Sequence, residues 1–258
     1  MLTYMRGGQK LELNPQYALG IDPGINNWLS CITNVGTSFI IDGRKVKSLN
    51  QWYNKRVSVL KEGKLQGYWD EQLAHITEKR NRQMRDAINK AARLVVDHCL
   101  DHQIGVVVFG WNQGQRQEVK LGKITQSFVQ IPTAKLKERV KQLCEYHSIK
   151  FVETEESYTS KTSFLDGDFL PTFGAKPEGW TPSGKRVKRG MYRTGKGKLI
   201  NADLNGAANI LRKVETQLGL VLVKVCRQVL TLCTRILVWE TKTKKRNRAA
   251  LAPCVATV

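Results

Sequence analysis

Two aspartates lie where predicted regular elements meet turns, and both are candidates for metal-dependent chemistry. Asp22 follows a short apolar run and begins the turn Asp22-Pro23-Gly24, whereas Asp203 lies in the first turn of a helix predicted over 201–213. Hydrolysis of a phosphodiester needs an activated water and a stabilised leaving oxygen, and two divalent ions about 4 Å apart, bridged by carboxylates, provide both. The ordinary alternative is that Asp22 begins a turn and Asp203 caps a helix.

The charge of the chain favours a polyanionic partner. The 258 residues include 42 Lys+Arg and 22 Asp+Glu, which gives a formal net charge of +20. A charge this positive in a chain of this size favours nucleic acid. A hydrophobic content of 41% excludes a wholly disordered chain. No stretch predicts a membrane span or a secretory signal, so no membrane partner is expected.

The elements predicted from hydrophobic patterning must position these aspartates. Three short strands over 18–21, 28–33 and 38–41 predict an antiparallel meander, and two more strands are predicted over 104–109 and 149–154. A long basic helix is predicted at about 70–102, with further helices over 132–147 and 201–213. This order predicts an α/β domain with a mixed sheet covered by helices.

Ten side chains are candidates for contacts with nucleic acid. Three lie on the first half of the long helix, where an ordinary solvated face is the alternative, and most of the others lie in a Gly- and Pro-rich segment with strong positive charge. Tyr192 offers a ring on which a base can stack. The candidates are Arg80, Arg82, Arg85, Lys161, Lys185, Arg186, Lys188, Arg189, Tyr192 and Arg193.

The C-terminal part contains an apolar stripe with steps of four and three residues. Its positions predict a heptad-like helix over 214–241 that packs on its own domain or, alternatively, self-associates through 218–239. The six cysteines form no Cys-x-x-Cys pair and are expected to be free thiols in a cytoplasmic protein.

Several motifs resemble, in the same order, those of the TnpB (OrfB) family, which are transposon-encoded relatives of the type V CRISPR nucleases. The resemblance covers roughly residues 15–213. It implies an RNase H-like, RuvC-type domain with three acids and Mg²⁺ (or Mn²⁺), and an RNA-guided DNA endonuclease whose partners are DNA and a guide RNA. The motifs are GIDPGINN (20–27), IDGRKVKSLNQWYNKR (41–56), RNRQMRDAINKAARLVVDHC (80–99), ESYTSK (156–161), GKRVKRG (184–190) and LINADLNGAANILRK (199–213).

The resemblance assigns two of the three acids directly. Asp22 matches the acid of the first motif and Asp203 the acid of the last. The family's second acid follows the strand over 104–109, where this chain has Gly110; Glu155 or Glu156 on the neighbouring strand would then complete the site. Neighbouring strands lie about 5 Å apart, and successive strand residues face opposite sides, so only one of the two glutamates is expected to point inward.

Two further departures from the family shape the expected organisation. No cysteine occurs between 145 and 225, so we expect a basic loop-rich insert in place of the family's zinc ribbon and no zinc. Only about twenty residues precede GIDPG, which indicates an N-terminally truncated copy. We expect a short leader over 1–17, the first and middle part of the RuvC-like domain over 18–161, the insert over 162–198, the last RuvC-like motif over 199–213, the apolar helix over 214–241 and a basic tail over 242–258.

Two other classes of function compete with a nuclease. A nucleic-acid-binding protein without catalysis, either a regulator or a remnant of the same family, would explain the missing acid near Gly110. An actin-like ATPase also places a GIDPG-like turn after a strand, but it needs a second glycine-rich phosphate loop, for which FGWNQG (109–114) is a poor substitute.

Overall fold

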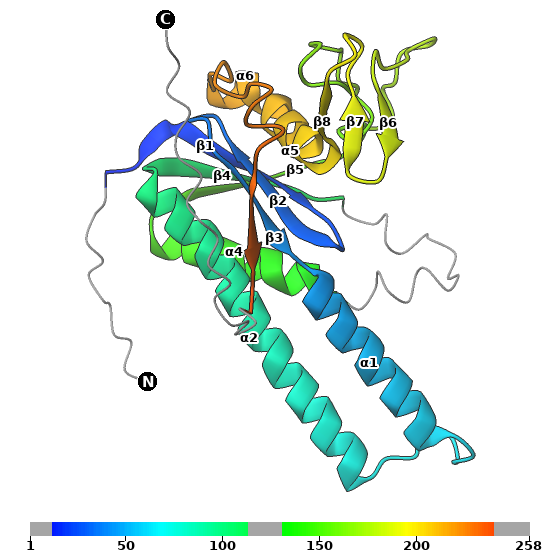
Figure 1. Ribbon diagram of the computed structural model, residues 1–258. Helices are drawn as coiled ribbons and strands as arrows, with labels where there is room; N and C mark the ends of the chain where they lie inside the picture. Colours follow the sequence, from blue (N-terminus) through cyan, green and yellow to red (C-terminus); the bar gives the residue numbers. More distant parts are fainter. Residues whose placement is uncertain (1–11, 113–130, 240–258) are drawn as a thin grey trace, which may run out of the picture.

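A six-stranded mixed sheet forms the centre of the computed structural model, which describes residues 12–112 and 131–239 (Figure 1). The order across the sheet is β5-β4-β1-β2-β3-β9. β1 pairs antiparallel with β2, and β2 with β3, whereas β1–β4, β4–β5 and β3–β9 are parallel pairs. The strands are β1 (Asn14–Pro23), β2 (Asn27–Thr33), β3 (Ser38–Asp42), β4 (Ile104–Gly110), β5 (Lys150–Thr154) and β9 (Thr234–Leu237).

Helices cover both faces of this sheet, as the sequence predicts. α2 (Glu71–Asp101) and α4 (Thr133–Tyr146) cover one face, and α5 (Ala202–Lys213) covers the other (Figure 1). The side chains of β1 alternate accordingly: Leu19 and Ile21 enter the core beneath α2 and α4, whereas Ala18 enters the core beneath α5. The predicted meander, the two later strands and the three helices are thus confirmed.

A helical hairpin projects beyond the sheet (Figure 1). α1 (Arg44–Lys61) runs back along the first half of α2. Arg80 joins the two helices by donating to the Oδ1 of Asn50, and its guanidinium lies 5.3 Å from the centre of the Tyr53 ring. α1 was not among the predicted helices, although its apolar residues recur at steps of three and four and form its partly buried face: Val46, Leu49, Tyr53, Val57 and Leu60.

The insert is more ordered than a loop. β6 (Lys185–Lys188), β7 (Met191–Arg193) and β8 (Leu199–Asn201) form a small antiparallel sheet. The Asp166 carboxylate accepts hydrogen bonds from the Ser163 hydroxyl at 2.6 Å, the Ser183 hydroxyl at 3.1 Å and the Gly195 amide at 2.5 Å. One partly exposed carboxylate therefore ties three parts of the insert together.

The prediction of a helix over 214–241 is wrong. Within 214–239, the part of this range that the structure describes, only α6 (Glu215–Leu218) is helical, and the chain then passes through turns into β9. Leu220 and Leu222 are buried while Val221 and Val223 are exposed, which is the two-residue alternation of an extended chain. Leu222, Val225 and Val229 pack beneath α5 in the chain's own core, so a helical self-association stripe over 218–239 does not exist.

Parts of the predicted organisation lie outside the described residues. These are residues 1–11 of the predicted leader and the basic tail over 242–258. Of the helices described within 12–112 and 131–239, none combines the length and the apolar character needed to cross a membrane.

Asp42 fastens the edge strand β9 to the rest of the sheet. Its Oδ2 accepts hydrogen bonds from Arg44 Nε at 2.8 Å and from Arg235 Nη1 at 2.9 Å, and its side chain is only 3% exposed. Burial by itself raises the pKa of Asp42, but the bonds from Arg44 and Arg235 outweigh it, so the pKa lies below its ordinary value of 3.8.

We therefore expect Asp42→Asn to lower the free energy of unfolding by about 1–3 kcal/mol at neutral pH. In the wild type, the stabilisation that ionised Asp42 provides is complete above the ordinary pKa of the group. It is lost as the pH falls through the lower pKa of the folded state. Urea unfolding across pH 3–7 measures both effects.

The matched control is Asp97→Asn, because Asp97 forms an exposed ion pair with Arg93 on α2. Its removal should change the free energy of unfolding by less than about 1 kcal/mol. Equal effects of the two substitutions would contradict the role given to Asp42.

Candidate active site

Three carboxylates from distant parts of the sequence come together at one edge of the sheet. Asp22 lies near the end of β1, Glu156 lies just beyond the end of β5, and Asp203 lies in the first turn of α5. Because β1, β4 and β5 run parallel, their carboxyl ends share this edge. The charges of Glu156 and Asp203 both act on Asp22, which places the three groups in one electrostatic cluster.

Two glycines let α5 approach β1 closely enough to bring Asp203 towards Asp22. A Cβ atom on Gly20 would lie 2.6 Å from Leu211 Cγ and 2.7 Å from the Ala207 carbonyl oxygen. A Cβ atom on Gly206 would lie 2.5 Å from Asp22 Oδ2. Real contacts of this kind are wider. Because the Ala207 oxygen belongs to the backbone, Gly20 requires glycine, whereas a side chain at Gly206 would displace the Asp22 carboxylate.

Glu156, rather than Glu155, faces the cluster. The side chain of Glu156 lies against Gly110, where an added Cβ atom would meet Glu156 Cγ at 2.9 Å. Glu155 turns away: it forms an ion pair with Lys213 and accepts a hydrogen bond from the Ser157 amide at 3.1 Å. The alternation expected from the sequence thus gives one inward glutamate, and Gly110 provides the space that its side chain fills.

Two asparagines of α5 hold the segment that carries Glu156. The Asn209 side chain donates to the carbonyl oxygens of Thr159 at 2.9 Å and Thr162 at 2.8 Å, and Asn205 also donates to Thr162. Both side chains are fully buried. These hydrogen bonds join the segment that follows Glu156 directly to α5.

Asp203 has a cationic and an amide partner. Arg186 Nη2 donates to its Oδ1 at 2.8 Å, and Asn27 Nδ2 donates to its Oδ2 at 2.6 Å. The Oδ1 of Asn27 in turn accepts a hydrogen bond from Arg235 at 2.8 Å, which fixes the direction of the amide. Neither Asn27, which lies within the motif GIDPGINN, nor Arg235 was among the residues predicted for the site.

Burial and like charge make Asp22 unusual. Its removal from water raises the pKa of this carboxyl well above the ordinary value, and the nearby charges of Glu156 and Asp203 raise it further. Arg186 opposes this effect only in part. All three carboxyl groups can therefore ionise together only when additional positive charge is present.

A divalent cation of the hard type suits this donor set, because Mg²⁺ and Mn²⁺ prefer carboxylate oxygens. Within 12–112 and 131–239, no three His, Cys, Asp or Glu side chains are arranged to hold a metal ion as they stand. In the structure both carboxylate oxygens of Asp203 accept hydrogen bonds instead, one from Arg186 and one from Asn27.

The predicted nucleic-acid contacts fall into three groups. Arg186 is part of the site, whereas Lys161, Lys185, Lys188, Arg189 and Arg193 are exposed around it or on the small sheet. Arg82 and Arg85 are exposed on α2, and Arg80 is occupied in the hairpin contact described above. The stacking role predicted for Tyr192 is wrong, because its ring is fully buried and its hydroxyl donates to the Lys161 carbonyl oxygen at 2.7 Å.

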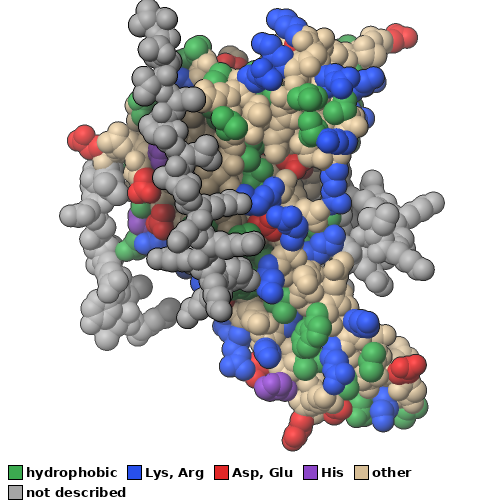
Figure 2. Space-filling model, viewed as in Figure 1, with side chains coloured by type: hydrophobic (Ala, Val, Ile, Leu, Met, Phe, Trp, Pro, Cys, Tyr) green, Lys and Arg blue, Asp and Glu red, His purple; other side chains and the backbone are tan. Residues whose placement is uncertain are grey.

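Basic side chains spread across the face that carries the site. Figure 2 shows Lys and Arg side chains from the small sheet, across the middle of the molecule, to the helices α1 and α2. Such a surface suits a phosphate backbone that passes the carboxylate cluster.

Comparison with protein families supports the relationship drawn from the motifs. Residues 8–114 match the family model OrfB_IS605, described as a probable transposase. This match confirms the resemblance to the TnpB (OrfB) family. The matched range includes Asp22 and ends just after Gly110. A comparison with curated proteins gives no match.

Two solved structures show a similar fold. The complex of Cas12f1 with sgRNA and target DNA has a TM-score of 0.51 and 19% identity, covering 76% of this chain and 50% of that one. A CRISPR-Cas12f ternary complex has a TM-score of 0.52 and 19% identity, covering 77% of this chain and 39% of that one. The fold is thus RNase H-like, of the RuvC type, and the chain spans half or less of the length of these two structures.

The electrostatics of Asp22 predict an increase in stability on substitution. In EDTA at neutral pH, we expect Asp22→Asn to raise the midpoint of thermal unfolding by a few degrees, because folding of the wild type must either bury the charge of Asp22 beside two other carboxylates or protonate this group. Calorimetry of the wild type and the variant, with Asp97→Asn as an exposed control, measures this. A lower midpoint for Asp22→Asn would show that its charge stabilises the fold.

Proposed function

We propose that this chain is a transposon-associated, metal-dependent DNA endonuclease of the TnpB type that hydrolyses phosphodiesters at Asp22, Glu156 and Asp203. The observation that carries this proposal is the convergence of these three carboxylates, from β1, β5 and α5, at one edge of an RuvC-type sheet. The basic surface on either side of the site supports a nucleic-acid substrate.

The three carboxylates would hold Mg²⁺ or Mn²⁺, which supplies an activated water and stabilises the leaving oxygen when bound. Asn27 orients Asp203 through its amide, while Gly110 and Gly206 leave room for the side chains of Glu156 and Asp22. Glu155 is outside the ligand set proposed here, since Lys213 neutralises it.

Arg186 gives the site a second cationic group. In the structure its guanidinium neutralises Asp203, and the residue lies on the exposed edge of the small sheet. We propose that Arg186 releases Asp203 when the site is loaded and then contacts a phosphate of the substrate strand, for which its planar fork of donors is suited.

The proposed partners rest on the same family resemblance. We propose DNA as the substrate strand, and a guide RNA as a partner of the intact family. The support is the family match together with two Cas12f structures, one of them a complex with sgRNA and target DNA.

Cleavage of labelled single-stranded DNA by the purified chain tests the proposal. The reaction is run with Mg²⁺, with Mn²⁺ and with EDTA, and beside Asp203→Ala. We expect cleavage that requires metal and disappears in the variant, while DNA binding persists. Metal-independent cleavage, or cleavage equal in Asp203→Ala, would contradict the assignment.

The second candidate is a nucleic-acid-binding protein without catalysis. The Arg186–Asp203 ion pair favours it, because an acid that is permanently paired cannot serve as a metal ligand. This reading predicts salt-sensitive DNA or RNA binding without any cleavage, and no change in binding on substitution of Asp22 or Asp203.

Substitution of the adjacent glutamates should separate their roles. Substitution of a residue that supports metal ligands without binding the metal typically lowers activity roughly 10–100-fold. We expect Glu156→Gln to lower the cleavage rate by more than this, because Glu156 is a proposed ligand. We expect the loss for Glu155→Gln to stay within this range. Initial rates at saturating Mg²⁺ measure both. A greater loss for Glu155→Gln would reverse the assignment.

Arg186 should influence metal and DNA in opposite directions. We expect Arg186→Ala to bind Mn²⁺ more tightly, because the guanidinium no longer competes for Asp203, and to bind single-stranded DNA more weakly. The control is Lys185→Ala, an exposed neighbour with no hydrogen bond to Asp203, which should lower only DNA affinity. Calorimetry with Mn²⁺ and DNA anisotropy measure the two effects, and weaker Mn²⁺ binding by Arg186→Ala would exclude the competition.

A further inference from the structure

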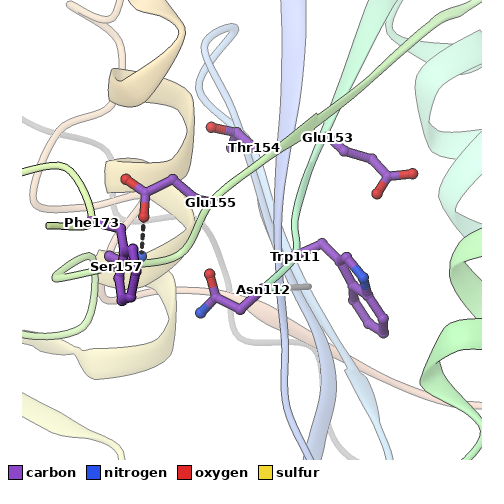
Figure 3. Close-up of a pocket in the computed structure, with 7 residues that line it drawn as sticks. All are labelled: Trp111, Asn112, Glu153, Thr154, Glu155, Ser157 and Phe173. Atoms are coloured by element: carbon purple, nitrogen blue, oxygen red, sulfur yellow. Dashed lines mark hydrogen bonds between the residues drawn. The ribbon is translucent and has the colours of Figure 1, made fainter. Parts of the chain in front are cut away.

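A pocket of about 380 Å³ lies beside the segment that carries Glu156. Glu155 and Ser157, which flank Glu156 in the chain, are both among its walls (Figure 3). Its size is within the range of small-molecule sites, roughly 300–1,000 Å³. The remaining walls are Trp111, Asn112, Glu153, Thr154 and Phe173.

The two aromatic side chains that line the pocket, Trp111 and Phe173, differ in how firmly their surroundings hold them. Trp111 is held in place, because Lys137 Nζ lies 4.6 Å from the centre of its ring and Phe109 contacts it edge-on. Phe173, by contrast, is 75% exposed. Figure 3 shows Phe173 and Glu155 at one side of the pocket and Trp111 and Glu153 at the other. An exposed phenylalanine beside an acidic site is a platform for a flat ring.

Each acidic wall already has a lysine partner. Glu153 Oε2 accepts a hydrogen bond from Lys137 at 2.6 Å, and Glu155 is paired with Lys213. Lys213 also donates to the Pro171 carbonyl oxygen at 3.3 Å, so it joins the Glu155 wall to the segment that presents Phe173. The carboxylates retain lone pairs that accept further hydrogen bonds, but as ion pairs they add no net charge.

We propose that this pocket binds one nucleobase of the substrate strand, with its ring on Phe173 and its exocyclic amino group donating to Glu155 or Glu153. Adenine, cytosine and guanine carry such a group, and thymine and uracil do not. The base belongs to a nucleotide next to the scissile phosphate, because Glu156 lies in the chain between Glu155 and Ser157, two of the residues that line the pocket. The proposal rests on the proposed function, since it assumes that the cluster acts on a nucleic-acid strand.

Photochemical crosslinking tests the contact without cleavage. The full chain in EDTA is mixed with a single-stranded oligodeoxycytidine carrying 5-iodocytosine, binding is measured by anisotropy, and long-wavelength ultraviolet light then joins iodinated bases to stacked aromatic rings. Peptide mass spectrometry is expected to find the adduct on Phe173. An adduct only on other aromatic residues, or none on a bound oligonucleotide, would overturn the base subsite.

Affinity measurements give a second readout with a matched control. Phe173→Ala should weaken binding of oligodeoxycytidine about tenfold, in keeping with the loss of one stacked base, and should weaken oligodeoxythymidine less. Phe169→Ala is the control, because Phe169 is 63% exposed on the same segment but is not a wall of the pocket. Equal losses for the two oligonucleotides, or for the two variants, would contradict the proposal.

The outcomes separate the base subsite from the nuclease function. A Phe173 adduct in a chain that never cleaves DNA supports the subsite and contradicts the nuclease. Metal-dependent cleavage without a Phe173 adduct overturns the subsite alone, and a chain that does not bind the oligonucleotide overturns both.

Discussion

The close packing of α5 against β1 is the contact on which the rest of the site depends. Gly20 and Gly206 permit it, since a side chain at either position would collide with its neighbour. The consequence is that Asp203, one helical turn before Gly206, is brought towards Asp22. Burial raises the pKa of Asp22, and the charges of Glu156 and Asp203 raise it further. The fold thus places three acidic groups together, and Arg186 offsets only part of their negative charge.

The position of the second acid follows from the same geometry. Val108 and Gly110 of β4 face α5, and the register pairs Gly110 with Thr154 of β5. Two residues beyond Thr154, the side chain of Glu156 therefore returns to the face of α5, and the absence of a side chain at Gly110 leaves room for it. Asn205 and Asn209 hold the segment in this position. The three acids therefore form one site, although the second acid follows β5 and not its neighbour β4.

The sequence predicted the parts of the fold that have a clear hydrophobic period. α2 and α4 show helical spacing and β4 is continuously apolar, so each was found close to its observed bounds. α1 has the same kind of spacing, from Val46 through Leu49 and Tyr53 to Leu60, so its sequence contained the signal for a helix, but the segment was used only for the family resemblance. In the C-terminal part, a stripe with helical spacing concealed the alternation of Leu220 to Val223, which belongs to an extended chain.

The site was predictable only in part. Asp22 and Asp203 were found from their positions and from the resemblance, but β5 has apolar residues on both faces, so its sequence did not show which glutamate points inward. The error at Tyr192 has a similar origin: composition indicated a basic loop, whereas β7 places this ring in the core. Asn27 and Arg235 are 208 residues apart, and no local pattern connects them.

Direct measurement of metal binding tests the central claim that Asp22, Glu156 and Asp203 form one divalent-cation site. Electron paramagnetic resonance of Mn²⁺ titrated into the wild type, and into Glu156→Gln, reports the bound ion without requiring cleavage. We expect saturable binding to the wild type that is lost or greatly weakened in Glu156→Gln. Equal binding by both proteins would contradict the assignment of Glu156, and no binding to the wild type would contradict the site itself.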